Sequence, residues 1–318
     1  MKAMVRETYC SPDLLRLADI DRPVAGDDDV LVRVVAAGVD QGVWHLVTGL
    51  PYLSRLASGP FRPRHRVPGL DVAGRVEAVG ANVTRFRPGD EVYGTCDGSF
   101  AEYARTSEDR LDHKPANLTF EQAAAVPTSA FPALQGVRPV QAGQRVLVIG
   151  AGGGVGTFAV QLATAFGADV TGVCSTAKVD LVRSLGADVV DYTREDFADG
   201  AHHYDLIVDT AGHRTLSHLR RALTPTGTLV VIGSEVKGRW LQGTDRQLRM
   251  FLLSPFVRQK LRPLFSTARQ EDLRLLTKLL ASGQVTPIIA RTYPLDEVAE
   301  AIRYLRSGQA AGKIVITV

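Results

Sequence analysis

Apolar and polar residues alternate in two different patterns along the chain, and the change falls near Thr119. Before it, short apolar stretches broken by Pro, Gly and Asp predict strands and turns, most clearly in Val30–Ala36, Leu70–Val79 and Glu91–Tyr93. After it, apolar runs alternate with stretches of helical spacing. Five successive strand candidates contain Val146, Val170, Val189, Leu206 and Leu229, and Leu261–Thr267 is a candidate sixth.

This order of elements predicts the fold class. Alternating strands and helices form a doubly wound parallel sheet of the Rossmann type, with helices on both faces. The stretch Thr119-Phe120-Glu121-Gln122 begins an alanine-rich helix in the manner of a capping box. We therefore expect an α/β chain in which a β-rich first part precedes a Rossmann sheet.

The most informative stretch follows the first strand of that sheet. The apolar run Val146–Ile149 leads into glycines on both sides of Val155, and Phe158, Leu162 and Phe166 then recur at helical spacing. The glycines are Gly150, Gly152, Gly153, Gly154 and Gly156. Glycine allows a tight turn and a close backbone approach to phosphates, and a helix N-terminus supplies unpaired N–H groups with a positive dipole end. We predict a dinucleotide-binding turn in which these glycines and Val155 contact the pyrophosphate.

The end of the next strand, Asp169–Cys174, indicates which dinucleotide is bound. An NAD site would place an acidic residue here for the ribose hydroxyls. The chain instead continues Ser175-Thr176-Ala177-Lys178, with no carboxylate before Asp180. Hydroxyl groups and a lysine suit the 2′-phosphate of NADP, which a carboxylate would repel. We predict that Ser175 and Lys178 bind it; the alternative is that Lys178 is a solvated residue of the following helix.

Composition narrows the remaining possibilities. With 318 residues the chain is long enough for two domains, and a net charge of +3 gives no ground for nucleic-acid binding. Cys10, Cys96 and Cys174 are odd in number and far apart, which argues against a disulfide framework and a cysteine-rich zinc lobe. The N-terminus has no signal-peptide pattern, and no apolar run could span a bilayer. We expect a cytoplasmic protein without stable membrane association.

Several short motifs, each common by itself, occur in a specific order. They are Ala37–Asp40, Pro68–Gly74, Arg87–Val92, Gly98–Tyr103, Ala124–Pro127, the glycine cluster and Ala311–Val315. The set resembles the zinc-independent medium-chain dehydrogenases/reductases of the quinone oxidoreductase type, which are zeta-crystallin-like, across essentially the whole length. The resemblance implies a GroES-like catalytic domain at 1–117 and 269–318, an inserted NADP-binding Rossmann domain at 118–268 and an active cleft between them. We also expect a homodimer.

The same resemblance implies which residues act on the acceptor. Asp40, Gln41 and Tyr52 match cleft positions of the family, although an asparagine is usual where Asp40 stands. The carboxylate could hydrogen-bond Tyr52 or a proton-delivering water. Alternatively, Asp40 is a strand-end carboxylate that backbone N–H groups satisfy. A second departure is Pro132, at a place where the family often has a threonine facing the nicotinamide.

Further cofactor contacts follow from the resemblance. Tyr192 and Lys313 are implied as additional groups near the 2′-phosphate, and Gly233 and Ser234 as the start of a loop beside the nicotinamide. The amphipathic basic segment Arg239–Arg262 comes next, and we consider a lid, a dimer contact or a membrane-surface helix. We favour lid or interface, with Phe256 and Val257 nearest the nicotinamide. The polar loop Leu50–Val67 is either a surface excursion or part of the cleft mouth.

A metal is not expected. Zinc-dependent relatives have a cysteine where this chain has Asp40, and a His-Glu pair where it has Leu70-Asp71. A structural zinc lobe would require four close cysteines or equivalents, which the chain lacks.

Together these observations predict a zinc-independent, NADPH-dependent oxidoreductase. It would transfer hydride to quinones or α,β-unsaturated carbonyl compounds, whose conjugation stabilises the negative charge that follows hydride attack. The alternatives are a dedicated enoyl or alkenal reductase and a non-catalytic NADPH-binding protein.

Overall fold

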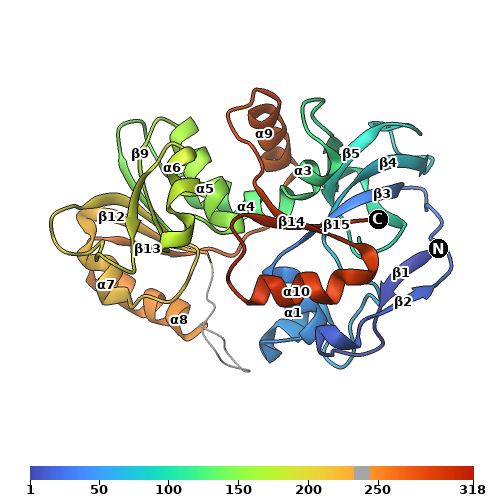
Figure 1. Ribbon diagram of the computed structural model, residues 1–318, viewed down its shortest axis with the longest axis horizontal. Coiled ribbons are helices and arrows are strands. Elements are labelled where there is room, and N and C mark those ends of the chain that lie inside the picture. Colours follow the sequence, from blue (N-terminus) through green and yellow to red (C-terminus); the bar gives the residue numbers. More distant parts are fainter. Residues whose placement is uncertain (233–243) are drawn as a thin grey trace. The chain divides into compact units, whose positions relative to one another are not determined.

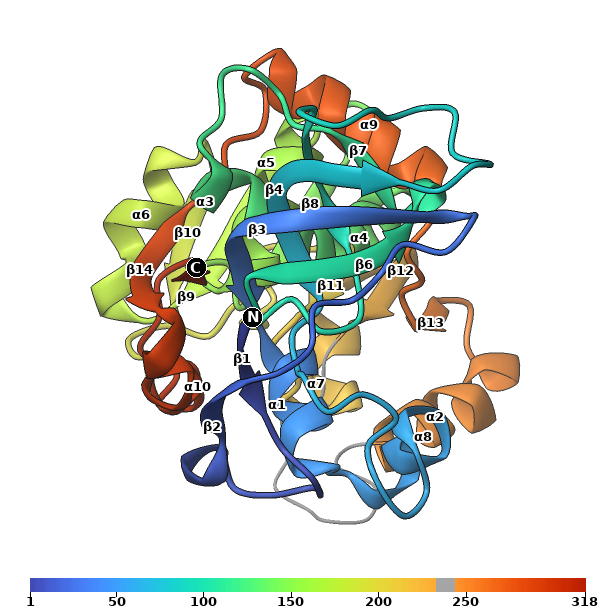
Figure 2. The ribbon, with the colours of Figure 1, turned by 90° about the vertical axis from the view of Figure 1, so that its right-hand side faces the viewer.

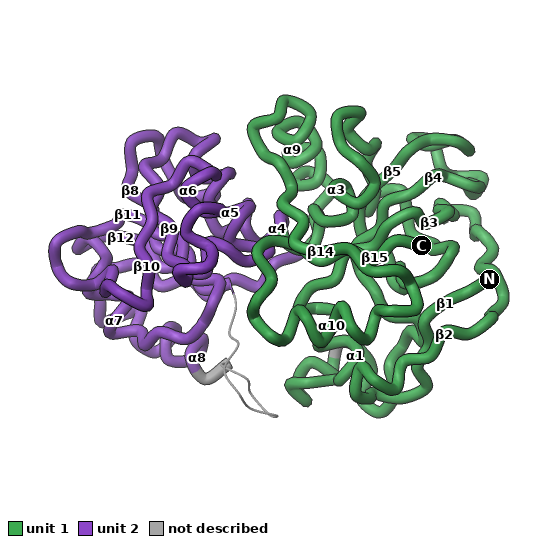
Figure 3. Tube along the Cα trace, viewed as in Figure 1, with its two compact units in different colours: residues 1–129, 268–318 green, residues 130–267 purple. Residues whose placement is uncertain are grey.

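The computed structural model describes residues 1–232 and 244–318 and divides into two units (Figures 1 and 3). Unit 1 comprises Met1–Ser129 and Ala268–Val318, and unit 2 comprises Ala130–Thr267. The first and last parts of the chain thus fold together in unit 1. Among the described residues, no helix is both long and apolar enough to cross a membrane.

Unit 1 is built on a largely antiparallel sheet in which strands from both ends of the chain meet (Figure 2). Its strand order is β14-β15-β3-β4-β5-β7, and β6 also pairs with β3. The bounds are β14 (Ile289–Pro294), β15 (Lys313–Thr317), β3 (Asp29–Val39), β4 (Asp71–Val79), β5 (Glu91–Thr95), β7 (Leu111–His113) and β6 (Tyr103–Ser107). A separate ribbon pairs β1 (Lys2–Val5) with β2 (Arg16–Asp19).

The strands expected in the first part of the chain are present because their apolar residues are buried. Val30, Val32 and Val34 of β3 pack with Val72 and Val76 of β4 in one core cluster. A second cluster joins the end of β3 to α1 (Gln41–Thr48) and α10 (Val298–Arg306). The remaining helices of this unit are α2 (Arg55–Ser58), α3 (Phe120–Ala124) and α9 (Gln270–Ala281), with single 3-10 turns at Pro12–Leu14, Tyr52–Ser54, Glu108–Arg110 and Leu295–Glu297.

Unit 2 contains the predicted doubly wound sheet. Within the described residues its strands are all parallel and run in the order β10-β9-β8-β11-β12-β13. The bounds are β8 (Arg145–Ile149), β9 (Asp169–Cys174), β10 (Asp188–Asp191), β11 (Tyr204–Asp209), β12 (Leu223–Val231) and β13 (Lys260–Pro263). The described helices are α4 (Pro127–Val137), which crosses the unit boundary, α5 (Gly154–Ala165), α6 (Val179–Ser184), α7 (Leu216–Arg221) and α8 (Thr244–Leu253). Short 3-10 turns lie at Thr176–Lys178 and Ser254–Phe256.

Two details differ from the sequence-based expectation. The sixth strand ends at Pro263 instead of Thr267, because its partner β12 ends at Val231, whose carbonyl accepts the last bond from Leu264 N at 2.9 Å. The capping box at Thr119 is present, but the short helix α3 that it begins contacts β3 and β4 and therefore lies in unit 1. Pro132, which the resemblance placed where the family often has a threonine, lies inside α4.

Candidate functional site

The glycine-rich turn of unit 2 has the geometry of a phosphate cradle. It begins with Gly150 at φ 82°, a conformation that favours glycine. A Cβ on Gly156 would lie 2.1 Å from the carbonyl oxygen of Gly150, so no side chain fits there. The helix α5 begins immediately after Gly153, which provides no side-chain cap. The first amides of this 12-residue helix therefore lack intrahelical acceptors and suit an anion.

Lys178 lies directly over this turn. A Cβ on Gly152 would be 2.8 Å from both Cβ and Cδ of Lys178, so the lysine stem packs against the glycine backbone. Burial lowers the pKa of the Lys178 ammonium. Ser175, which begins the same 3-10 turn, accepts the Lys178 N–H with its carbonyl oxygen at 2.9 Å. The structure thus brings together the glycine turn, Ser175 and Lys178.

A carboxylate that the sequence interpretation did not include lies at the same corner. Asp191 ends β10 beside the end of β9, and it is 6% exposed. Thr176 Oγ1 donates to its Oδ2 at 2.6 Å, and Thr193 donates to its Oδ1 from both N (3.0 Å) and Oγ1 (2.8 Å). These hydrogen bonds, that from Thr176 foremost, hold the pKa of Asp191 below its usual value. The Thr176 hydroxyl is therefore engaged by Asp191.

Unit 1 contains a cluster of buried charges. Lys313 Nζ, at the first residue of β15, lies 3.5 Å from Asp71 Oδ2 and 3.7 Å from Asp40 Oδ2. Lys313 is 2% exposed, Asp71 0% and Asp40 8%, so water screens these charges little. Thr128 donates to Asp71 Oδ1 from its N–H at 2.8 Å and from its hydroxyl. Two carboxylates therefore share one ammonium in the protein interior.

The charge balance of this cluster shows in the titration of Asp71. Burial raises the pKa of Asp71 to about 6, against 3.8 for an ordinary aspartate. The Lys313 ammonium and the Thr128 hydrogen bonds act in the opposite direction, and the Asp40 carboxylate adds to the rise. The site therefore stabilises a proton on Asp71 under mildly acidic conditions.

Asp40 has two different oxygens. Oδ1 accepts the Val43 N–H at 3.1 Å and caps the N-terminus of α1. Oδ2 faces Lys313 and has no hydrogen-bond partner among the described residues. The alternative prediction, in which backbone N–H groups satisfy the Asp40 carboxylate, therefore applies to Oδ1 and not to Oδ2.

The other two acceptor-side candidates follow Asp40 along the chain. Gln41 is the first residue of α1, and its Oε1 accepts from Arg306 Nη1 at 3.0 Å. Tyr52 begins the 3-10 turn after α1, and the Arg55 guanidinium carbon lies 4.8 Å from its ring centroid. Arg55 also lies 4.4 Å from the Tyr9 ring and donates from Nε to Gly49 O at 2.9 Å. Arg55 therefore holds Tyr52 against the end of α1.

Comparisons with known proteins find two matching families. Residues 26–176 match the alcohol dehydrogenase GroES-like domain, and residues 185–316 match the zinc-binding dehydrogenase family. The chain is 34% identical to 2-methylene-furan-3-one reductase of Solanum lycopersicum, over 99% of this chain and 79% of the relative. It is 32% identical, with the same coverage, to an NADPH-dependent alkenal/one oxidoreductase of Arabidopsis thaliana chloroplasts. The structure of the quinone oxidoreductase from Coxiella burnetii superposes with a TM-score of 0.84 at 26% identity, covering 100% of this chain and 99% of the other.

The chain belongs to the medium-chain dehydrogenase/reductase family.

One of the two matching families of this dehydrogenase/reductase is described as zinc-binding, and a zinc site requires several His, Cys, Asp or Glu side chains close together. Among the residues that the structure describes, no three His, Cys, Asp or Glu side chains are grouped so that they could hold a metal ion. Asp40 stands where zinc-dependent relatives have a cysteine, and Leu70-Asp71 where they have the His-Glu pair. Here the Lys313 ammonium lies 3.7 Å from Asp40 and 3.5 Å from Asp71. A second cation at this point would be repelled by the first, and the donor set does not fit zinc.

This placement corrects one predicted cofactor contact. Lys313 was expected near the 2′-phosphate, but its ammonium is buried in unit 1 and pairs with two carboxylates. Sequence resemblance located the residue, whereas its partners, 242 and 273 positions away along the chain, could not be inferred from local pattern.

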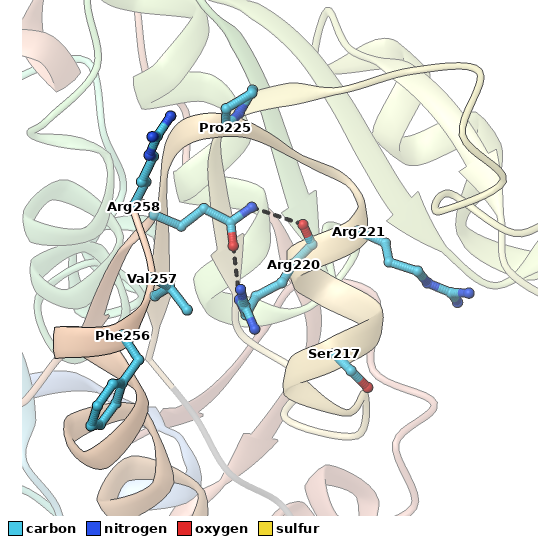
Figure 4. A pocket seen from close by; sticks show the side chains of 8 residues that line it. Ser217, Arg220, Arg221, Pro225, Phe256, Val257 and Arg258 are labelled. Atoms are coloured by element: carbon cyan, nitrogen blue, oxygen red, sulfur yellow. Dashed lines mark hydrogen bonds between the residues drawn. The ribbon is translucent and has the colours of Figure 1, made fainter.

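Phe256 and Val257 are also placed differently from the prediction. They line a surface groove with Ser217, Arg220 and Arg221 of α7, Pro225 of β12 and the residues that precede β13 (Figure 4). Gln259 accepts from Arg220 Nε at 2.8 Å and donates to Arg220 O at 3.0 Å. The groove therefore lies at the amino ends of β12 and β13, whereas dinucleotides bind at the carboxyl ends of such strands. This position argues against nicotinamide contacts.

The remaining predicted contacts divide into two groups. Tyr192 follows β10, is 48% exposed, and its N–H donates to Cys174 O at 3.1 Å, so it lies beside Ser175. Gly233 and Ser234 lie outside the described residues, as does the first part of the segment Arg239–Arg262. The described remainder of that segment forms α8, the following 3-10 turn and most of β13.

Proposed function

We propose that this chain is an NADPH-dependent oxidoreductase that reduces quinones or α,β-unsaturated carbonyl compounds without zinc. The observation that carries the proposal is the uncapped N-terminus of α5 behind a glycine cradle, with Lys178 packed over Gly152. The names of two relatives, a 2-methylene-furan-3-one reductase and an alkenal/one oxidoreductase, support the conjugated acceptor. The likeness to a quinone oxidoreductase structure supports the same class of reaction.

Each cofactor-side group has a separate task in this proposal. The α5 amides of Gly154, Val155 and Gly156 bind the pyrophosphate, and the glycine backbone allows its close approach. Ser175 and Lys178 bind the 2′-phosphate, assisted by Tyr192. Bound NADPH supplies the hydride. A nicotinamide cofactor of either kind fits the cradle, and the choice of NADPH rests on the second strand, β9, which ends at Cys174 and is followed by Ser175-Thr176-Ala177-Lys178 without a carboxylate.

The acceptor-side groups polarise the carbonyl and supply a proton. The Tyr52 hydroxyl donates to the acceptor oxygen, where negative charge develops during hydride transfer. Arg306 donates to the amide oxygen of Gln41. In this proposal the Nε2 hydrogens of Gln41 donate to the acceptor's carbonyl oxygen. Asp40 fixes the start of α1 and so the position of Gln41.

A single screen tests the proposal. The purified protein is mixed with NADPH and a panel of quinones, enones, alkenals and saturated aldehydes, and oxidation of the cofactor is followed with and without a chelator. We expect turnover with conjugated acceptors only, unchanged by the chelator. Binding of NADPH without turnover of any acceptor would instead support the non-catalytic alternative. We further propose a homodimer, which light scattering at several protein concentrations would test.

A further inference from the structure

The loop after β11 lies against the glycine turn and carries an unassigned arginine. Asp209, the last residue of β11, accepts the N–H groups of Ala211 (3.1 Å) and Gly212 (3.0 Å) with Oδ1. Thr210 Oγ1 donates to Ile149 O at 2.8 Å, and a Cβ on Gly150 would lie 2.5 Å from that hydroxyl oxygen. The loop is therefore fixed at the carboxyl edge of the sheet, next to the phosphate cradle.

Arg214, two residues after Gly212, lies beside two aromatic rings. Its guanidinium carbon is 5.8 Å from the centroid of Tyr192 and 6.0 Å from that of Phe197. The side chain is half-buried, and within residues 1–232 and 244–318 it makes no hydrogen bond or ion pair. By contrast, the nearby Arg183 and Arg194 pair with Asp180 and Asp191. A guanidinium held by stacking keeps its planar set of N–H donors available to an anion.

Its neighbours place this arginine at the adenosine corner. Tyr192 is bonded through its backbone to Cys174, the residue before Ser175, and Lys178 follows in the same turn. Asp191, the carboxylate that ends β10, is engaged by threonine hydroxyls. Lys178 and Arg214 thus reach this corner from different loops, one packed on the glycine turn and one on Tyr192.

We propose that Arg214 is a specificity-determining residue whose guanidinium binds the 2′-phosphate of the cofactor. This inference rests on the proposed NADPH dependence and adds a second cation, beside Lys178, to the recognition of that phosphate. A guanidinium can donate two parallel hydrogen bonds to a phosphate, which a lysine cannot. Tyr192 is then a support for Arg214 as well as a contact in its own right.

The test measures binding of two probes that differ in the 2′-phosphate. Adenosine 2′,5′-bisphosphate and adenosine 5′-monophosphate are titrated into wild type and Arg214→Gln by calorimetry at one ionic strength. We expect the variant to bind the bisphosphate about tenfold more weakly and the monophosphate unchanged. The matched control is Arg183→Gln, an exposed arginine of α6, which should leave both affinities unchanged. Arg214→Lys keeps the charge but not the two parallel N–H donors, so it should retain only part of the preference for the bisphosphate.

The outcomes separate this inference from the function on which it rests. A wild type that binds both probes equally would overturn the NADPH preference itself. A wild type that prefers the bisphosphate, together with an Arg214→Gln variant of the same preference, would overturn only the role of Arg214. Equal losses for the two probes would show that Arg214 supports the loop or the adenine, and would also overturn it.

Discussion

The buried carboxylate of Asp71 makes a quantitative prediction about stability and pH. Its pKa is raised from 3.8 to about 6, because burial disfavours the charged form. For a group with a raised folded-state pKa, the stabilisation is fully present below the unfolded pKa and is lost as pH rises through the folded pKa. A difference of roughly two pKa units corresponds to about 3 kcal/mol, of which about 2 kcal/mol falls between about pH 4.5 and about pH 7.5.

The substitution that isolates the contribution of Asp71 to the pH dependence of stability is Asp71→Asn, because asparagine resembles the protonated acid and does not titrate. Urea unfolding of wild type and variant is measured across that pH range, and the difference in the free energy of unfolding is plotted against pH. Other titrating groups cancel in the difference to the extent that the substitution leaves them unchanged. We expect wild type to lose about 2 kcal/mol relative to Asp71→Asn as pH rises.

Two results would contradict this reasoning. If the difference in free energy of unfolding between wild type and Asp71→Asn is flat from about pH 4.5 to about pH 7.5, Asp71 titrates as an exposed aspartate does. With the measurement extended to lower pH, a difference that increases with pH up to about pH 4.5 and is flat above it would mean that Lys313 and Thr128 outweigh burial and favour the carboxylate. Lys313→Met serves as a reference, because removing the shared ammonium leaves two buried carboxylates unpaired and should destabilise the protein by about 3–5 kcal/mol near neutral pH.

Three further predictions concern the proposed reaction. Lys178→Ala should weaken NADPH binding by roughly ten- to a hundredfold and leave NADH binding nearly unchanged; equal losses would show that Lys178 supports the turn instead of the phosphate. Tyr52→Phe should lower turnover about a hundredfold with little effect on cofactor affinity, as measured by kcat and by direct NADPH titration, whereas Asp40→Asn, which can keep the cap on α1, should be the milder change. Elemental analysis should find no stoichiometric zinc, and about one zinc per chain with activity lost on chelation would refute the metal-free proposal.

The Rossmann sheet was predictable because its signals are local. A strand buried on both faces reads as a continuous apolar run, and each run in unit 2 coincides with a strand of the sheet. Gly150 and Gly156 were identifiable for the same reason, since their roles depend on the neighbouring backbone. The limits of α3 and β13 were less predictable, because they depend on which element each one packs against.

The charge cluster of unit 1 could not be predicted in this way. Asp40, Asp71 and Lys313 each stand in a recognisable motif, but nothing in those motifs indicates that the three side chains meet. The antiparallel pairing of β15 with β3, in register at Ile314 and Val39, brings the two ends of the chain together. The first residue of β15 is thereby placed beside the residue that follows β3, and the ammonium reaches both carboxylates.

That pairing also suggests why an aspartate is tolerated where asparagine is usual in the family. A buried carboxylate is costly unless a positive charge and hydrogen bonds accompany it. Asp40 receives both, since its Oδ1 caps α1 and its Oδ2 faces Lys313. The second carboxylate, Asp71, accepts hydrogen bonds from Thr128, and burial raises its pKa to about 6. Asp40 thus lies at the start of α1, next to Gln41, with the Lys313 ammonium on one side and the Val43 N–H on the other.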